Sequence, residues 1–341
     1  MIKEALNGKT LDDIYQLISK YGFSLSHATS LANNLYRKRI TDISQFHGIP
    51  RKLKKILSSG ISVGTFLPVH SEVSDDDTIK YLFRNAEGKQ FETVYIPDKK
   101  RSTVCVSTQS GCRMGCPFCV TGKYGFYGSL SAGEIVNQII SIPDAGKITH
   151  VVFMGMGEPM DNLENVLKAC RIITAEWGMA ISSGNITVST VGITHNIKSF
   201  LEQSECNLAV SLFSPFSDER IRVIPVEKKY PVHEIIDLLK NYPVRKKRRF
   251  SIAYVMIENV NDSDMHLKEL KVMLGGSKIR VNLLPYHPGK DDPNASSSNE
   301  RMLYFKHNLV ISGISASVRR SRGADISAAC GLLATGLKKE F

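Results

Sequence analysis

The stretch Gly111-Cys112-Arg113-Met114-Gly115-Cys116-Pro117-Phe118-Cys119 places three cysteines on one short segment, with three and then two residues between them. Thiolates hold iron–sulfur clusters, usually four to a cluster. Three close together leave one iron open to a ligand from outside the protein. A structural zinc site normally uses paired Cys-x-x-Cys knuckles and a closed shell of four ligands, and no second knuckle occurs here. The stretch therefore predicts a [4Fe-4S] cluster held by Cys112, Cys116 and Cys119.

The sequence around this stretch alternates between apolar runs and amphipathic segments. Such alternation builds parallel βαβ units. Strands are predicted at 103–107, 151–155, 186–191, 207–212, 250–257, 279–284 and 315–319, and helices near 131–142, 161–176, 195–203, 231–241, 263–274 and 299–312. Six units and a closing strand are too few for an eight-fold barrel, so we expect an α/β fold with a partial (β/α)6 barrel. Its active site is expected in the loops that follow the strands.

Two smaller segments precede the predicted barrel. Residues 1–62 are expected to form a small helical, basic accessory domain; Thr10 and Asp13 make a capping box for its first helix. Two short strands at 78–84 and 90–96 flank Asn85-Ala86-Glu87-Gly88, which is typical of a hairpin. We expect residues 63–98 to form a linking β-hairpin and residues 99–341 the barrel.

Composition places the chain among soluble globular proteins, with 42% hydrophobic and 23% charged residues. No apolar run reaches the ~20 residues of a membrane helix, and no signal sequence is evident. We expect a cytoplasmic monomer that does not bind membranes. The net charge of +11 favours a polyanionic partner, although a merely basic protein is the alternative. The densest run, residues 245–249, could equally grip a phosphate backbone or form a solvated turn.

The segment Gly155-Met156-Gly157-Glu158-Pro159 follows the second barrel strand. Glycines allow the backbone to approach a ligand, and a carboxylate can accept hydrogen bonds from an amino group. Alone the pattern is weak. After a cluster loop, it predicts a binding segment for the amino group of a cofactor.

Four further cysteines are present, and their settings differ. Cys105 lies on the first barrel strand, and Cys330 lies in a small-residue segment beside Gly331. Both are near enough to the predicted site to be reactive. Cys170 has helical spacing with apolar residues, and we interpret it and Cys206 as small core hydrophobes.

The cluster loop resembles that of the radical S-adenosylmethionine superfamily, including the aromatic Phe118 before the third cysteine. Nearly the whole chain is similar to the RlmN and Cfr methyltransferases, which methylate adenosine in 23S ribosomal RNA. The segments that carry the resemblance are Phe91–Pro97, Cys105–Ser107, Gly155–Pro159, Ser189-Thr190, Ser211-Leu212, Arg280–Leu283 and Ala328–Gly331.

The resemblance implies a mechanism that uses two molecules of S-adenosylmethionine per turnover. The first would methylate Cys330. The second, bound at the cluster, would supply a 5′-deoxyadenosyl radical that activates this methyl group. The carbon would then bond to the adenine ring, and Cys105 would release the product by forming a disulfide with Cys330. Glu92 falls at the family's proton acceptor; a plain hairpin carboxylate is the alternative.

The resemblance also implies which residues bind S-adenosylmethionine. They are Gly157, Glu158, Ser189, Ser211, Leu212, Phe213 and His287. Two positions depart from the family, which has histidine where this chain has Phe213 and asparagine where it has His287. An imidazole can replace an amide as a hydrogen-bond partner, whereas phenylalanine offers only its backbone or its ring.

The implied activity is methylation of adenosine carbon 2 in 23S rRNA, and of tRNA as well, with an electron donor such as flavodoxin. Three alternatives stay open. A Cfr-type enzyme would methylate carbon 8 with the same residues. A non-catalytic Fe–S RNA-binding protein would need neither Cys105, Cys330 nor Glu92. A radical activase acting on a protein glycine would need neither the basic N-terminal domain nor the terminal cysteine.

Overall fold

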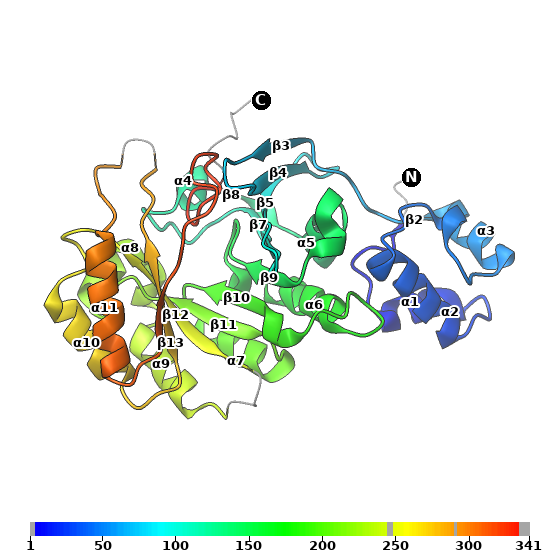
Figure 1. The fold of residues 1–341 in the computed structure, drawn as a ribbon. Helices are drawn as coiled ribbons and strands as arrows, with labels where there is room; N and C mark the ends of the chain where they lie inside the picture. The colour runs from blue at the N-terminus through cyan, green and yellow to red at the C-terminus, as the bar shows by residue number, and fades with distance from the viewer. Residues whose placement is uncertain (1–3, 244–247, 290–291, 334–341) are drawn as a thin grey trace.

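The computed structural model describes residues 4–243, 248–289 and 292–333, and shows a helical lobe beside an open barrel (Figure 1). The lobe contains α1 (Leu11–Ser19), α2 (Leu25–Ala32), the π-helix η1 (Asn33–Arg37) and α3 (Arg51–Gly60). Thr10 accepts a hydrogen bond from the Asp13 N–H, and the Asp13 carboxylate accepts one from the Thr10 N–H, so the predicted capping box is present. The lobe is not wholly helical, because β1 (Glu4–Ala5) pairs in parallel with β2 (Ile61–Ser62).

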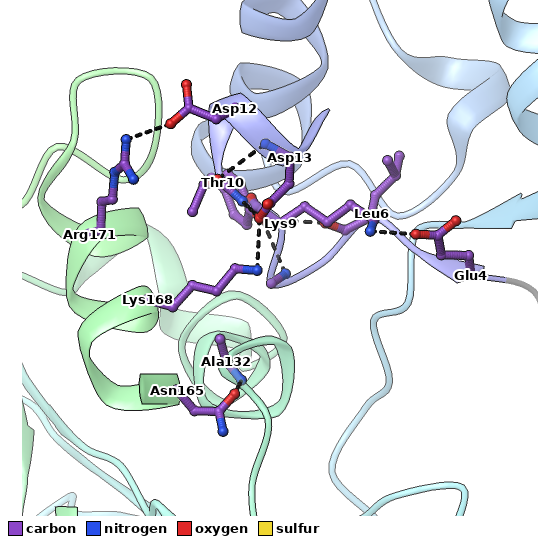
Figure 2. Close-up of polar contacts among 12 residues, drawn as sticks. Glu4, Leu6, Lys9, Thr10, Asp12, Asp13, Ala132, Asn165, Lys168 and Arg171 are labelled. Atoms are coloured by element: carbon purple, nitrogen blue, oxygen red, sulfur yellow. Dashed lines mark hydrogen bonds and ion pairs between the residues drawn. The ribbon is translucent and has the colours of Figure 1, made fainter. Parts of the chain in front are cut away.

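The helical lobe packs against the barrel helices α5 (Ala132–Ile140) and α6 (Leu163–Thr174). Gly8 has φ +87°, and a Cβ atom there would stand 2.6 Å from Gly133 Cα, so two glycines let the backbones meet. Beside this contact, Lys168 reaches Asp13 and Arg171 reaches Asp12, each at 2.7 Å (Figure 2). The lobe is therefore fixed to the barrel by close backbone packing flanked by ion pairs.

The predicted hairpin forms, and it is part of the barrel sheet. Strands β4 (Ile79–Arg84) and β5 (Gln90–Ile96) pair antiparallel, β5 pairs antiparallel with the first barrel strand, and β3 (His70–Val73) adds an edge that the sequence did not reveal. The division of the chain at residues 62 and 98 stays a prediction.

All seven predicted barrel strands are present and run parallel. They are β6 (Thr103–Cys105), β9 (His150–Phe153), β10 (Ile186–Thr190), β11 (Asn207–Ser211), β12 (Phe250–Met256), β13 (Arg280–Pro285) and β14 (Ala316–Val318). The ten-stranded sheet has the order β14-β13-β12-β11-β10-β9-β6-β5-β4-β3. Since β14 and β3 are edges among the described strands, the partial barrel is confirmed.

The predicted helices between these strands are also present. Besides α5 and α6 they are α7 (Thr194–Gln203), α9 (Val232–Asn241), α10 (Asp264–Leu274) and α11 (Asn299–Ile311); the short α8 (Ser217–Val223) was not predicted. Short 3₁₀ turns complete the elements: η2 (Ile43–Gln45), η3 (Pro143–Lys147), η4 (Pro159–Asn162), η5 (Ser183–Asn185) and η6 (Pro225–Lys228).

The two faces of the curved sheet differ in composition. On β12, Ile252 and Tyr254 are fully buried, whereas Ser251 and Ala253 line the barrel interior. On β11, Val210 is likewise fully buried, whereas Ala209 lines the barrel interior. Large apolar side chains therefore form the core on one face, and small or polar ones leave space on the other.

The cluster loop leaves the sheet on a separate two-stranded ribbon. Strand β7 (Gln109–Gly111) pairs antiparallel with β8 (Phe126–Ser129), with a register shift between Ser110 and Gly111. The loop that joins them contains α4 (Val120–Tyr124). The ribbon was not predicted.

Candidate active site at the carboxyl ends of the strands

The three cysteines of the loop are brought together by backbone contacts. The Cys112 N–H donates to the Gly125 carbonyl at 2.7 Å, and the Cys119 N–H donates to the Cys116 carbonyl at 3.1 Å. Gly111 has φ +78°, and a Cβ atom there would overlap the Gly125 carbonyl. The loop thus closes on itself at its two ends through a position that only glycine fits.

The chemistry of this donor set fits an iron–sulfur cluster. Burial is the main cause that raises the pKa values of Cys112 and Cys116, and the charge of Cys119 raises both further, so the thiols lie within electrostatic reach of one another. All three are free. Within the described ranges, no three His, Cys, Asp or Glu side chains converge as ligands of a single metal ion would. A cubic cluster instead takes each thiolate on a different iron.

The Gly155–Pro159 segment packs on the strand that leads to the cluster loop. Gly157 has φ +96°, and a Cβ atom there would stand 2.5 Å from the Gln109 Cβ. The Glu158 N–H donates to Gln109 Oε1 at 3.0 Å, and Gln109 Nε2 donates to Asp161 at 2.8 Å. Gly157 therefore serves close packing against Gln109.

Glu158 is a buried carboxylate in the loop that follows β9. Its oxygens accept hydrogen bonds from Thr190 Oγ1 at 2.6 Å, from the Val191 N–H at 2.9 Å and from the Met160 N–H at 2.9 Å. Burial is the largest influence and raises the pKa of Glu158 to about 7, although these bonds oppose it. A carboxylate near this pKa is poised to accept hydrogen bonds from a cofactor amino group at neutral pH.

Ser189, Ser211 and Leu212 lie at the ends of β10 and β11, as expected for neighbouring parallel strands. Leu212 is fully buried, so its side chain belongs to the core and only its backbone could meet a ligand. Ser189 and Ser211 are half-buried.

Arg220 of α8 connects the ends of β10 and β11. It is fully buried and donates to the carbonyls of Leu212 at 2.9 Å, Ser211 at 3.0 Å and Val191 at 2.6 Å. It also pairs with the buried Glu227 carboxylate. The guanidinium thus joins β10 to β11 directly beside the Glu158 site.

Phe213 contacts the cluster loop, and His287 contacts the segment that leads to Cys330. The Phe213 ring stacks on Phe118 of the cluster loop, with centroids 5.8 Å apart and planes 15° from parallel. His287 Nε2 lies 2.6 Å from Ser321 Oγ, in the segment that leads to Cys330. At the position where the family has a histidine, this chain therefore packs the phenyl ring of Phe213 on the cluster loop.

Cys105 and Cys330 meet at one end of a cavity of about 790 Å³ inside the barrel. Burial is the main cause that raises the pKa of Cys105, and the charge of Cys330 adds to it, so the two thiols lie close to each other. Burial and the charge of Cys119 likewise raise the pKa of Cys330, while Arg319 lowers it. Cys330 is accessible, and its accessible surface faces this cavity.

The segment that carries Cys330 is held on both sides. Towards the hairpin, Ser74 Oγ donates to Asp325 at 2.6 Å and Lys80 Nζ donates to the Ile326 carbonyl at 2.7 Å. Towards the cluster loop, the Val120 N–H donates to the Gly331 carbonyl at 2.8 Å. Figure 1 shows this segment crossing from β14 towards α4 and the β3–β4 edge.

Glu92 lies on the interior face of β5. It is buried, and Lys80 Nζ stands 3.9 Å from its carboxylate. Val94, two residues further along, lines the cavity and pairs with Cys105. Glu92 is therefore on the same face of the sheet as Cys105.

Three residues of the site were missed from the sequence: Gln109, Arg220 and Lys80. Gln109 lies 49 residues from Glu158 and Lys80 lies 246 residues from Ile326, so no local pattern could reveal these two. Arg220 lies only eight residues from Leu212, but nothing in its neighbours marks it as buried. Cys170 and Cys206 are buried, as interpreted. They also lie within reach of each other, since Cys206 raises the pKa of Cys170 and Cys170 lowers that of Cys206.

Of the basic run 245–249, residues 245–247 lie outside the described residues. Arg248 donates to the carbonyls of Leu201 at 2.8 Å and Cys206 at 3.0 Å, and so fixes a turn. Arg249 lines the barrel cavity.

Comparison with known proteins gives consistent matches. Residues 106–270 match the Radical SAM superfamily. The chain is 43% identical, over 99% of both chains, to a probable dual-specificity RNA methyltransferase RlmN of Parabacteroides distasonis. It is 37% identical to a dual-specificity RNA methyltransferase RlmN of Syntrophobacter fumaroxidans, over 95% of this chain and 96% of the relative. The crystal structure of a radical SAM methyltransferase from Sphaerobacter thermophilus superposes with a TM-score of 0.89 at 37% identity, over 96% of this chain and 98% of that one.

The superfamily match begins after Cys105 and ends before Cys330, whereas the full-length relatives cover both positions. Among the described helices, none has the length and apolar character needed to cross a membrane.

Proposed function

The chain belongs to the RlmN family of radical S-adenosylmethionine RNA methyltransferases, and on this premise we propose that it methylates carbon 2 of an adenosine in 23S rRNA and in tRNA. The observation that carries the proposal is the placement of Cys105 and Cys330 at one end of the same cavity, with Cys330 within electrostatic reach of Cys119. Methylation through a protein thiol needs these two cysteines beside a cluster, whereas a non-catalytic RNA-binding protein does not.

Cys330 acts first as a nucleophile. Its thiolate Sγ would take a methyl group from one S-adenosylmethionine, which leaves as S-adenosylhomocysteine, and would become a thioether. Arg319 favours the thiolate that this displacement needs, because it lowers the pKa of Cys330 against the effect of burial. The segment contacts at Asp325 and Gly331 keep the sulfur at the mouth of the cavity.

The cluster and a second S-adenosylmethionine, when bound, supply the radical that removes a hydrogen atom from this methyl group. Cys112, Cys116 and Cys119 would hold the cluster, and Glu158 would orient the cofactor amino group. The adenine carbon is a poor nucleophile, so a carbon radical reaches it where polar methyl transfer does not. Covalent attachment to Cys330 divides one difficult step into easier ones.

Glu92 and Cys105 complete the reaction on the bound RNA. Glu92, whose carboxylate lies 3.9 Å from Lys80 Nζ, takes the proton from the substituted ring carbon, while the one surplus electron of the ring radical would pass back to the cluster. The Cys105 thiolate then attacks Cys330 Sγ. A disulfide forms as the bond between this sulfur and the methylene carbon breaks. The electron pair of that bond goes to the carbon, which takes up a proton to become the methyl group, and methylated RNA leaves.

The RNA would be held mainly through its phosphates. The chain carries a net charge of +11, and Arg51, Lys52 and Lys55 are exposed on α3 of the helical lobe. Phosphate contacts of this kind supply sequence-independent affinity, while the target base leaves its stack to enter the cavity. An electron donor such as flavodoxin would reduce the cluster, and we expect the enzyme to act as a monomer.

The decisive experiment is mass spectrometry of nucleosides. The protein is reconstituted with iron and sulfide without oxygen, and then given S-adenosylmethionine, a reductant and unmodified 23S RNA or tRNA. The proposal expects 2-methyladenosine. A product of 8-methyladenosine would keep the mechanism and overturn the position. Cofactor cleavage without methylated RNA would overturn the substrate.

Two variants test the roles of the cysteines. Cys105→Ala is expected to accumulate a covalent protein–RNA adduct through Cys330, because the sulfur cannot be released. Cys330→Ala is expected to cleave cofactor but to methylate no RNA. Free, fully methylated RNA from either variant would remove that residue from the mechanism. Cys170→Ala is the matched control, since Cys170 lies in the core, outside the cavity.

A further inference from the structure

The barrel cavity extends well beyond the predicted active site. It runs from Cys105 and Cys330 to the amino ends of the strands, where Arg101 precedes β6, Arg249 precedes β12 and Arg280 begins β13. His287 is the only predicted cofactor residue among its described lining residues. The target base would enter at the end that holds Cys105 and Cys330, so the amino-end part of the cavity has no occupant in the proposed reaction.

Arginine side chains dominate the charge of this cavity. Arg101, Arg249 and Arg280 surround the amino-end mouth because parallel strands begin at one edge of a sheet, and Arg319 and Arg320 contribute from the segment after β14. A sixth lining arginine, Arg322, pairs with Asp76 at 3.9 Å, whereas across the described part of the chain none of these five makes an ion pair with a carboxylate. Asp98 is the one acidic residue among the described residues that line the cavity.

Two of these arginines, Arg101 and Arg319, lie within electrostatic reach of each other. Burial and then the charge of Arg101 lower the pKa of Arg319, although the two residues belong to segments at opposite ends of the barrel sequence. Burial and Arg101 lower the pKa of His150 as well. Unpaired like charges in a partly enclosed space repel, and a bound anion would relieve that repulsion.

We infer that the amino-end mouth of the barrel is a binding site for a phosphate-bearing anion. Guanidinium groups bind phosphate with paired N–H donors, and the cavity offers a neutral partner beside them in Ser251. The phosphate could belong to a small diphosphate or to the RNA itself. The site is separate from Glu158 and the cluster loop, so it does not depend on the proposed methyl transfer.

The test is calorimetric titration of the cluster-loaded full chain with inorganic pyrophosphate in 0.1 M salt. We expect saturable binding that weakens at least tenfold in Arg249→Gln/Arg280→Gln. The matched control is Arg84→Gln/Arg222→Gln, which removes the same charge from exposed positions outside the cavity and should bind like wild type. Thermal unfolding confirms that each variant is folded. Absence of saturable binding, or equal loss in both double variants, would overturn the site.

A competition experiment distinguishes the two sources of phosphate. If target RNA displaces pyrophosphate from the wild-type protein, the site binds RNA phosphates; if RNA and pyrophosphate bind together, it takes a free diphosphate. Either result is read from binding alone. An enzyme that binds pyrophosphate but yields no methylated RNA would thus refute the proposed function and leave this site in place.

Discussion

Glu158 shows how one residue can make cofactor binding depend on pH. Burial raises its pKa to about 7, so in the cofactor-free protein the carboxyl is increasingly protonated below neutrality. A protonated carboxyl accepts hydrogen bonds from an amino group poorly. We therefore expect the affinity for S-adenosylmethionine to fall about tenfold per pH unit below pH 7 and to level off above it. Equilibrium binding to the cluster-loaded protein between pH 6 and 8 measures this.

The same ionisation has the opposite effect on folding. A carboxyl whose folded pKa exceeds its unfolded value favours the protonated protein, so Glu158 reduces the stability of the cofactor-free chain as pH rises from about 4.5 to 7. Glu158→Gln should remove the pH dependence of cofactor affinity and that of stability. Asp161, whose charge also raises the pKa of Glu158, is paired with Arg113 at 2.6 Å; an unchanged pH profile in Glu158→Gln would transfer the effect to another group.

At this scale, sequence patterns predicted residues that carry chemistry and missed those that hold them. Glu158 is evident from its glycines and from the cysteines before it. Gln109, which binds the Glu158 N–H, lies 49 residues away along the chain, and nothing in its neighbours marks it. Phe213 was recognisable as a departure, but its stacking on Phe118 depends on the fold.

Two strand ends act as one element through the buried Arg220–Glu227 pair. Removing the arginine alone, in Arg220→Met, should destabilise the protein by about 3–5 kcal/mol, because Glu227 would be left buried and unpaired. Arg220→Met/Glu227→Leu should regain most of that stability. Its affinity for S-adenosylmethionine should still be at least tenfold weaker, since the Val191 and Ser211 carbonyls lose their common donor. Wild-type affinity in the folded double variant would show that the pair only stabilises the fold.

The segment of Cys330 should move when its contacts with the hairpin are removed. Asp325 accepts hydrogen bonds from Ser74 Oγ and from the Asp75 N–H. In Asp325→Ala, we expect Cys330 to react several-fold faster with iodoacetamide, as mass spectrometry of the alkylated peptide measures. Asp264→Ala, which removes an exposed carboxylate paired with Arg301 elsewhere, is the control and should leave the rate unchanged. An equal rate in both variants would mean that the hairpin does not hold the segment.

The elements that the sequence predicted are those with a repeated pattern. Barrel strands and helices alternate over more than 200 residues, so each supports the assignment of the next. Strand β7 has only the residues Gln109–Gly111 and pairs with β8 across the cluster loop, and β3 is a largely exposed edge. Neither has the alternating hydrophobicity that identifies a strand.

For the whole molecule, the docking of the helical lobe should depend on backbone packing more than on its ion pairs. Lys168→Ala/Arg171→Ala removes two partly exposed ion pairs and should change the free energy of unfolding by less than about 1 kcal/mol per pair. Gly8→Ala should destabilise by more than about 2 kcal/mol, because its Cβ would overlap Gly133. Urea denaturation measures both.

Gly22→Ala separates packing from backbone strain. Gly22 also has a positive φ, +80°, but a Cβ atom there would meet nothing within 4 Å. It should therefore lose only the strain, about 1 kcal/mol. A Gly8→Ala variant no less stable than Gly22→Ala would show that the helical lobe and the barrel can move slightly apart without loss of stability.

The contacts of the Cys330 segment have a consequence for inheritance. Its partners Ser74, Lys80 and Thr121 lie 251, 246 and 212 residues away from the positions they bind. The segment that carries the reactive cysteine therefore cannot be transferred to another chain by itself. A chimera that received residues 319–333 from a distant relative without the matching hairpin and loop residues would possess the thiol and lose its alignment, so substitutions in these three regions should be acquired together or not at all.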